Sequence, residues 1–293
     1  MRIIDCILYG GEPIALFRLD YLWDVVDEFV IVEAGETHSG KRKDLYLDKN
    51  ATMFKPYEAK IKRLIIDRFP DPSQEDLALL VNHGYKENTR SWFRETYQRN
   101  FPGAYLRDLG AAIFLCCDAD EIPRRELIEG LRNQYEDLNE PWKLEMLLFC
   151  YSSRWIKRSK WDRAFVVNDL GINSASIDDL RTSTSNRKYI ANAGWHLSYF
   201  MTEQEMARKM ESFCDADLNT KENSNPDWLR HCKETGVDLF HRGRRQDCLP
   251  YTGDDLPQNL RVYELTHIQD RLRSLTRPGF FEYLPSTNHG LIS

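Results

Sequence analysis

An uncharged run followed at once by three carboxylates, within residues 111–123, constrains the fold most. Its first seven residues are dominated by Ile, Phe, Leu and Cys, as in strands buried on both faces of a parallel sheet. Asp118, Asp120 and Glu121 follow directly, and Pro123 ends the strand before an amphipathic helix that extends to about residue 135. The pattern predicts a buried strand with an acidic turn at its carboxyl end, where open α/β sheets bind ligands.

This acidic turn has two interpretations. Alternation along a strand points Asp118 and Asp120 the same way, and two adjacent oxygen donors suit a hard cation that could hold a diphosphate. In the other interpretation, the carboxylates only complement the positive end of the following helix dipole. The local pattern leaves both interpretations open.

The preceding residues indicate a doubly wound α/β sheet. Strands are predicted at 3–9, 29–32 and 64–67, with helices at 14–23 and 50–62 between them, which is the order of such folds. Glu33 and Asp67 close two of these strands as Asp118 closes the later one. We therefore expect three carboxylates at one edge of the sheet.

The rest of the chain is less regular. Helices are predicted at 75–81, 89–101, 202–213 and 229–234, strands at 144–151 and 236–240, a polar loop at 219–228 and an irregular tail from 246. Arg94 and Gln98 share one face of the second of these helices, where they could contact a nucleotide or only solvent.

Composition limits the class of protein. The 293 residues are 42% hydrophobic, which predicts a folded globule, and the net charge of -6 disfavours nucleic acid as a partner. Seven cysteines without a CxxC pair fit reduced thiols in a cytoplasmic protein. No stretch approaches the roughly 20 apolar residues of a membrane-spanning helix, so we expect a soluble chain without a transmembrane segment.

Several motifs in a fixed order then resemble one family, glycosyltransferase family 17, over roughly residues 1–245. It is the family of the β-1,4-mannosyl-glycoprotein N-acetylglucosaminyltransferase that adds bisecting GlcNAc. The motifs are Val25-Val26-Asp27, Phe29-Val30-Ile31-Val32-Glu33, Ser39-Gly40-Lys41, Arg94-Glu95, Gln98-Arg99-Asn100, Asp118-Ala119-Asp120-Glu121-Ile122-Pro123-Arg124 and Gly194-Trp195-His196-Leu197-Ser198-Tyr199.

The resemblance implies an α/β, Rossmann-like nucleotide-sugar transferase fold of the GT-A type, with a mixed, mainly parallel sheet flanked by helices. It implies one domain over 1–293, with a nucleotide-sugar-binding half at 1–125, an acceptor-side half at 126–245 and a wrapping tail at 246–293. The implied reaction is an inverting transfer of a sugar, GlcNAc, from a UDP-sugar to a hydroxyl of a glycan or polysaccharide acceptor.

The resemblance also implies site residues. Manganese or magnesium would bridge the diphosphate to Asp118 and Asp120, and His196 would add a metal or phosphate contact. The residues expected at the donor are Glu33, Asp67, Arg94, Asp118 and Trp195, the last packing against a sugar.

The chain departs from the family pattern after the Gly-Trp-His motif. Where relatives often carry a His and a Glu, this sequence has Asp215 and Asp217. An inverting transfer needs a base for the acceptor hydroxyl proton, and the candidates are Glu211, Asp217 and Asp238. The membrane anchor of the animal enzyme is also absent, so we expect a cytoplasmic enzyme of bacterial or viral type.

Two other functions are compatible with the same residues. A metal-dependent sugar-nucleotide nucleotidyltransferase or hydrolase would use the same carboxylates around a bound diphosphate. A non-catalytic glycan-binding protein would keep the fold and its aromatic surface without a base.

Overall fold

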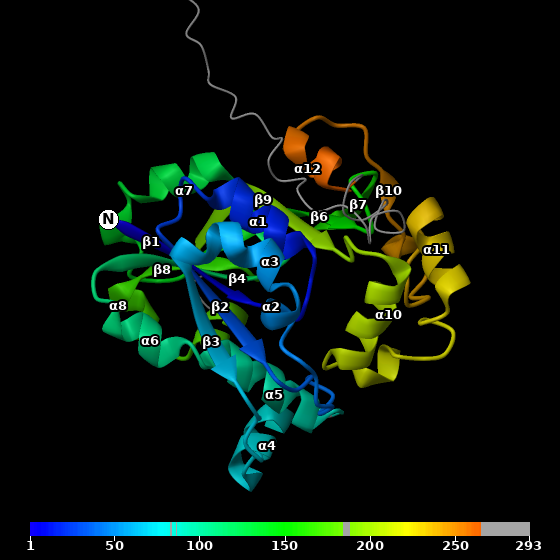
Figure 1. Cartoon of the computed structure of the whole chain (residues 1–293), viewed down its shortest axis with the longest axis horizontal. Coiled ribbons are helices and arrows are strands. Elements are labelled where there is room, and N and C mark those ends of the chain that lie inside the picture. The colour runs from blue at the N-terminus through cyan, green and yellow to red at the C-terminus, as the bar shows by residue number, and fades with distance from the viewer. Residues whose placement is uncertain (83, 86, 184–187, 265–293) are drawn as a thin grey trace, which may run out of the picture.

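The computed structural model describes residues 1–82, 84–85, 87–183 and 188–264 of the chain, and its strands form one ten-stranded sheet (Figure 1). The N-terminal part of this sheet is parallel, in the order β4-β1-β2-β3. This is the 3-2-1-4 order of a Rossmann-like half. The strands are β1 (Arg2–Leu8), β2 (Glu28–Ala34), β3 (Ile61–Ile66) and β4 (Ala112–Asp118), with α1 (Ile14–Leu22) between the first two.

The second part of the sheet is mixed. β8 lies antiparallel between β4 and β6, while β9 runs parallel to β6 and antiparallel to β5. The predicted α/β fold with a mixed sheet is therefore confirmed. The bounds are β5 (Glu121–Pro123), β6 (Trp142–Cys150), β7 (Trp155–Trp161), β8 (Phe165–Asn168), β9 (Lys188–Ser198) and β10 (Leu249–Pro250).

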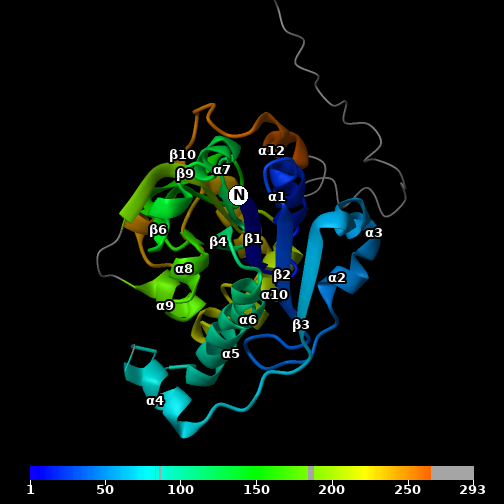
Figure 2. The same ribbon diagram turned by 90° about the vertical axis from the view of Figure 1, so that its left-hand side faces the viewer.

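Alternate residues of the buried strands supply two apolar cores, one on each face of the sheet. In β1, Ile3 and Ile7 belong to one core, and Ile4 and Cys6 belong to the other. Figure 2 shows the helices on either side of the parallel strands. The first core includes residues of α1, α7 (Arg125–Leu131) and α12 (Gln258–Tyr263), and the second those of α6 (Gly103–Asp108), α8 (Asp169–Ile172) and α9 (Ile177–Thr182).

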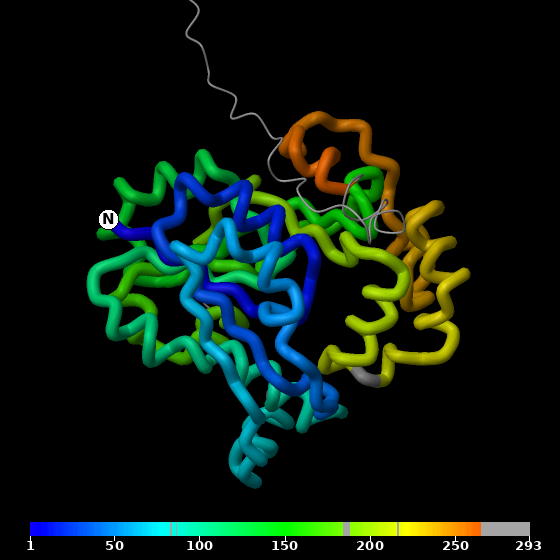
Figure 3. The backbone as a smooth tube through the Cα atoms, in the orientation of Figure 1, coloured from blue at the N-terminus to red at the C-terminus, as the bar shows by residue number. Residues whose placement is uncertain are grey.

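Two further helices, α10 (Glu203–Ser212) and α11 (Pro226–Thr235), pack together in a third apolar cluster that includes the carboxyl end of β6. They lie side by side on the right in Figure 1. The tube in Figure 3 shows the loop after β2 approaching the end of α10. There Ser39 Oγ donates to the Glu211 carbonyl at 2.7 Å, which joins the parallel part of the molecule to α10.

Several local predictions are wrong. The helix predicted at 50–62 is replaced by short helices, α2 (Tyr46–Lys49) and α3 (Ala51–Phe54), and by a 3-10 turn (Lys55–Lys60), since Pro56 interrupts the α-helical ladder. The loop predicted at 219–228 ends early, because Asn225 accepts hydrogen bonds from the Asp227 and Trp228 amides and caps α11.

The strand predicted at 236–240 is the third error. The Asp238 amide donates to Asp247 Oδ1 at 2.9 Å and the Leu239 amide to Tyr151 Oη at 3.0 Å, so side chains satisfy this backbone instead of a neighbouring strand. The predicted helices at 75–81 and 89–101 correspond to α4 (Gln74–Asn82) and α5 (Thr89–Asn100). The helix expected to reach residue 135 ends at Leu131.

The described part of the C-terminal segment contacts the sheet and α1. β10 pairs with β7, the Tyr263 hydroxyl donates to the Pro13 carbonyl, and Glu264 Oε1 accepts from the Ser153 amide at 2.8 Å. Residues 265–293 of the predicted tail lie outside the described residues, and the division at 125 and 245 stays a prediction. Within the described ranges, no helix has the length and apolarity needed to cross a bilayer.

Candidate active site

The acidic turn lies where the carboxyl ends of two neighbouring parallel strands meet. β1 and β4 pair in register, with Leu8 opposite Asp118. The Gly10-Gly11-Glu12 turn that follows β1 is therefore brought beside the acidic turn that follows β4. This is the edge of an α/β sheet at which ligands bind.

Asp118 is bound by two arginines. Its Oδ1 accepts from Arg99 Nη1 and its Oδ2 from Arg181 Nη2, both at 2.7 Å. Burial raises the pKa of this carboxyl, but Arg181 and Arg99 outweigh burial and lower the pKa to about 2. Asp118 is therefore a fixed anion whose two oxygens already have guanidinium partners.

Asp120 faces a different set of groups and is 5% exposed. Its Oδ2 accepts from Lys209 Nζ at 3.1 Å, and its Oδ1 lies 3.5 Å from His196 Nε2. Lys209 Nζ also lies 3.5 Å from Glu12 Oε1. Burial raises the pKa of Asp120, but Lys209 and His196 together hold it well below its usual range, so the carboxyl is ionised.

The side chain of Glu121 holds the acidic turn in place through several hydrogen bonds. It is fully buried, its Oε2 accepts from the Asp118 amide at 2.7 Å, and Arg181 donates to both of its oxygens at 2.9 and 2.6 Å. The Trp161 indole N–H donates to the same carboxylate. The Glu121 side chain therefore joins the backbone of the acidic turn to Arg181 of α9 and Trp161 of β7.

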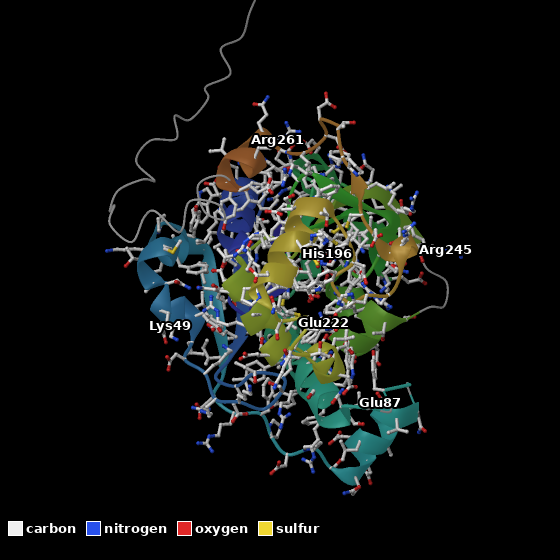
Figure 4. All side chains as sticks on the ribbon, turned by 90° about the vertical axis from the view of Figure 1, so that its right-hand side faces the viewer. Lys49, Glu87, His196, Glu222, Arg245 and Arg261 are labelled. Carbon is white, nitrogen blue, oxygen red and sulfur yellow. The ribbon has the colours of Figure 1, made fainter. Side chains whose placement is uncertain are left out.

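Gly194 explains how His196 reaches the site. A Cβ at Gly194 would lie 2.1 Å from the Ile122 carbonyl oxygen, so only glycine lets β9 approach β5 this closely. The resulting register places His196 opposite Glu121. Figure 4 shows His196 near the centre of the face that carries α10 and α11. The Gly-Trp-His motif therefore allows β9 to pair closely with β5, and this pairing places the His196 imidazole at the site.

Asp120 and His196 fit a divalent cation better than Asp118 does. Asp120 Oδ1 and His196 Nε2 lie 3.5 Å apart, longer than a well-formed hydrogen bond, and a carboxylate oxygen and an imidazole nitrogen are both common metal ligands. His196 Nδ1 is buried and has no hydrogen-bond partner among the described residues. In the same part of the chain no three His, Cys, Asp or Glu side chains are grouped as a complete metal site. A cation bound here would need further ligands, which a diphosphate can supply.

The two other strand-end carboxylates have separate partners. Glu33 is fully buried, and its carboxylate accepts from Lys43 Nζ at 3.1 Å and from the amides that begin α2, including that of Leu47 at 3.1 Å. Asp67 has a side chain 82% exposed, and Arg42 Nη2 donates to it at 3.1 Å. Among the described residues, neither shares a hydrogen-bond partner with Asp118.

Arg94 and Trp195 are held by neighbouring elements. Arg94 Nη1 donates to the His38 carbonyl at 3.0 Å, in the loop after β2. Trp195 is 2% exposed, with the Arg124 guanidinium 4.3 Å from its ring centre and Tyr21 packed edge-on. The ring therefore belongs to the apolar core, and its faces are covered by protein groups where a sugar was expected to pack.

The three candidate bases have different surroundings. Glu211 lies exposed in the last turn of α10, and exposed Asp217 accepts from Asn88 Nδ2 at 2.8 Å. Asp238 is 3% exposed and bound by Arg242 at 2.6 Å and Lys157 at 3.3 Å. Burial raises the pKa of Asp238, but the hydrogen bonds from Arg242 lower it to about 2.

The structure adds five residues that were not among the predicted site residues, namely Glu12, Arg99, Trp161, Arg181 and Lys209. Each contacts a residue of the acidic turn or a partner of one, yet each comes from a different element of the chain. Of these, only Arg99 lies inside a family motif named above, Gln98-Arg99-Asn100.

Comparison with known proteins gives a family and distant structural likenesses. The model of glycosyltransferase family 17 matches residues 1–242. No curated protein sequence matches the chain. Solved structures similar to it include a putative glucose-1-phosphate thymidylyltransferase from Bacillus anthracis in complex with a sucrose, at 10% identity and TM-score 0.34, covering 65% of this chain and 86% of that one. Another is a mannose-1-phosphate geranyltransferase from Thermus thermophilus, at 12% identity and TM-score 0.31, covering 68% and 74%.

The fold and the family match together define the class of protein as a glycosyltransferase with a Rossmann-like sheet. The chain belongs to glycosyltransferase family 17, as the resemblance in its motifs implied.

Proposed function

We propose that this glycosyltransferase moves a sugar, GlcNAc, from a UDP-sugar to a hydroxyl of a glycan or polysaccharide, with inversion and with help from a divalent cation. One observation carries the proposal. Asp120, at the carboxyl end of a buried parallel strand, faces both His196 and Lys209 and lies beside the glycine turn after β1. This combination suits a nucleoside diphosphate, whose phosphates need cationic partners and close backbone approach.

Manganese or magnesium would be held by Asp120 and His196, and it would supply stabilisation of the departing diphosphate. Lys209 would add a point charge toward the phosphates. Asp118, bound by Arg99 and Arg181, would position the turn and contact the donor through its exposed edge, since its side chain remains 30% exposed.

Among the other predicted donor residues, Arg94 is the best placed. It contacts the loop after β2, and a Cβ at Gly40 would come within 2.9 Å of its Nη2. This packing gives the loop and Arg94 a common position at the carboxyl edge of β2. Glu33 would act indirectly by fixing α2, whereas Asp67 and Trp195 would contribute through Arg42 and Arg124.

The base that accepts the acceptor proton is proposed to be Glu211 or Asp217. Both are exposed, and both lie on the segment that continues from Lys209. Asp238 is a weaker candidate, because Arg242 and Lys157 stabilise its ionised form and reduce its basicity. E211Q and D217N should therefore differ in activity. The variant that removes the base should lose sugar transfer but keep donor binding, and the other variant should keep both.

The donor assignment is tested by thermal shift with UDP-GlcNAc, other UDP-sugars and UDP, each with and without manganese. A ligand that binds the native state raises the melting temperature by mass action. We expect a shift with UDP-GlcNAc and UDP that requires manganese, and none with GDP-mannose as the matched control. The D120N variant should lose the manganese-dependent part of the shift in melting temperature. If no nucleotide sugar shifts the wild type, the proposed donor site is wrong, and glycan binding without turnover becomes the better hypothesis.

A further inference from the structure

Lys209 occupies a position inside the acidic site at which a cation would be expected. Its Nζ lies 3.1 Å from Asp120 Oδ2 and 3.5 Å from Glu12 Oε1, and Asp120 Oδ1 lies 3.5 Å from His196 Nε2. The ammonium thus bridges two carboxylates from two different loops. The Tyr199 ring centre, 5.6 Å from Nζ, covers another side.

Lys209 offsets half of the negative charge in this group before any ligand binds. Asp120 and Glu12 carry two negative charges, and Lys209 carries one positive charge. A divalent cation added beside Asp120 would face the ammonium at close range, and like charges separated by a few ångströms repel strongly in a partly buried site. The added diphosphate of a nucleotide would reverse this balance and give the ammonium new partners.

The side chain of Lys209 can make that exchange. It is 26% exposed, extends from the last turns of α10, and has a flexible four-carbon stem. Asp120 and His196 alone give an incomplete ligand set, because hard divalent cations usually combine one or two carboxylates with substrate phosphates. For both reasons, we expect the divalent cation to bind tightly only when the nucleotide is also bound.

We propose that Lys209 is a resident counter-ion of the donor site, which a divalent cation displaces only when a diphosphate is present to receive the ammonium. This inference rests on the proposed donor site and adds an order of binding to it. Lys209 is a positioning residue for the metal and a direct contact of the phosphates, and Glu12 is the carboxylate that holds Lys209 in the donor-free protein.

The test measures binding of manganese by the full chain, using the electron paramagnetic resonance of free Mn²⁺, with and without UDP. Wild type should bind Mn²⁺ weakly alone and at least about tenfold more tightly with UDP. Lys209→Gln should bind Mn²⁺ alone about tenfold more tightly than wild type and gain less from UDP. Lys209→Arg, which keeps the charge, should behave as wild type does.

Lys233→Gln is the matched control. Lys233 lies on α11 and also pairs with a carboxylate, that of Glu203, at 3.1 Å. It should leave both manganese affinities unchanged. Lys209→Met replaces the Gln variant if the latter does not fold, as judged by its melting transition.

The outcomes separate the inference from the proposed function. If UDP and Mn²⁺ bind wild type together but Lys209→Gln binds Mn²⁺ alone no better than wild type, the counter-ion inference is overturned and the donor site stands. If wild type binds neither UDP nor Mn²⁺ in any combination, both the proposed donor site and the counter-ion inference are wrong. Equal gain from UDP in wild type and Lys209→Gln also contradicts the inference.

Discussion

Arg18 and Asp5 form a fully buried ion pair directly beneath the acidic turn. Arg18 Nε and Nη2 donate to the two Asp5 oxygens at 2.7 and 2.6 Å, and both side chains are 0% exposed. The third nitrogen, Nη1, donates to the carbonyls of Asp118, at 3.4 Å, and Glu121. One guanidinium therefore connects β1, α1 and the backbone of the candidate site.

Replacing Arg18 by Met should lower the free energy of unfolding by roughly 3–5 kcal/mol, because Asp5 is left as an unpaired buried charge. Urea denaturation measures the change. The double variant with Asp5→Leu should recover much of the loss, since both charges are then removed. The exposed pair between Lys49 and Asp44 is the control, and Asp44→Asn should leave the urea midpoint unchanged. A midpoint for Arg18→Met equal to that of wild type would contradict the role assigned to the pair.

Asp120→Ala should reduce sugar transfer by about a hundredfold or more, because it removes the carboxylate that faces both His196 and Lys209. Transfer is measured with UDP-GlcNAc over a manganese titration. Glu140→Ala is the matched control, since the exposed Glu140 carboxylate pairs with Lys188 at 3.7 Å and has no role in the proposed site, and it should retain most of the activity. Wild-type activity with normal manganese dependence in Asp120→Ala would refute the metal assignment.

The pKa of Asp238 predicts a specific response of stability to acid. This pKa is lowered in the folded protein from 3.8 to about 2, so the ionised carboxyl stabilises the native state above pH ~4 and loses that effect as the pH falls toward 2. Asp238→Asn lacks this titration. The difference in unfolding free energy between wild type and the variant, measured by urea denaturation from pH 6 to pH 3, should therefore shrink with acidification. A difference that stays constant over this range would contradict the assigned pKa.

Thr202 should contribute about 1 kcal/mol through its cap of α10, the helix that carries Lys209. Thr202 Oγ1 accepts from the Glu205 amide at 3.3 Å, and Glu205 Oε2 accepts from the Thr202 amide at 2.9 Å, which is a complete capping box. Thr202→Ala should lose this amount in a urea denaturation and speed hydrogen exchange in the first turns of α10. Thr202→Ser keeps the hydroxyl and should behave as wild type does.

Much of the fold could be predicted because its signals are local. The apolar run before Asp118 is buried on both faces of the sheet, and the helix at 14–23 is observed nearly as expected. Pro56 and Asn225 show where local signals were underestimated, since one breaks a helix and the other begins one. These two errors changed the bounds of elements and left the topology intact.

The site was harder to predict, because its contacts join residues far apart in sequence. Glu33, Asp67 and Asp118 look alike as carboxylates at strand ends, yet one caps a helix, one lies in solvent and one pairs with two arginines. What differs is the tertiary partner of each. The same reason hid the contact of Glu12 with Lys209, which no spacing within a single element could indicate.

The pairing of β5 with β9 has a consequence for how the protein forms during synthesis. The strands β1 to β4 leave the ribosome before β9, so their pairings can form earlier in synthesis. The strand that contains Glu121 can pair with β9 only after Gly194 and His196 have been synthesised, much later in the chain. Pairings between such distant segments form slowly, since a long loop has to close before the contact forms. The parallel strands therefore precede the His196 imidazole in synthesis, and a nascent chain that ends before β9 carries part of the sheet without the complete candidate site.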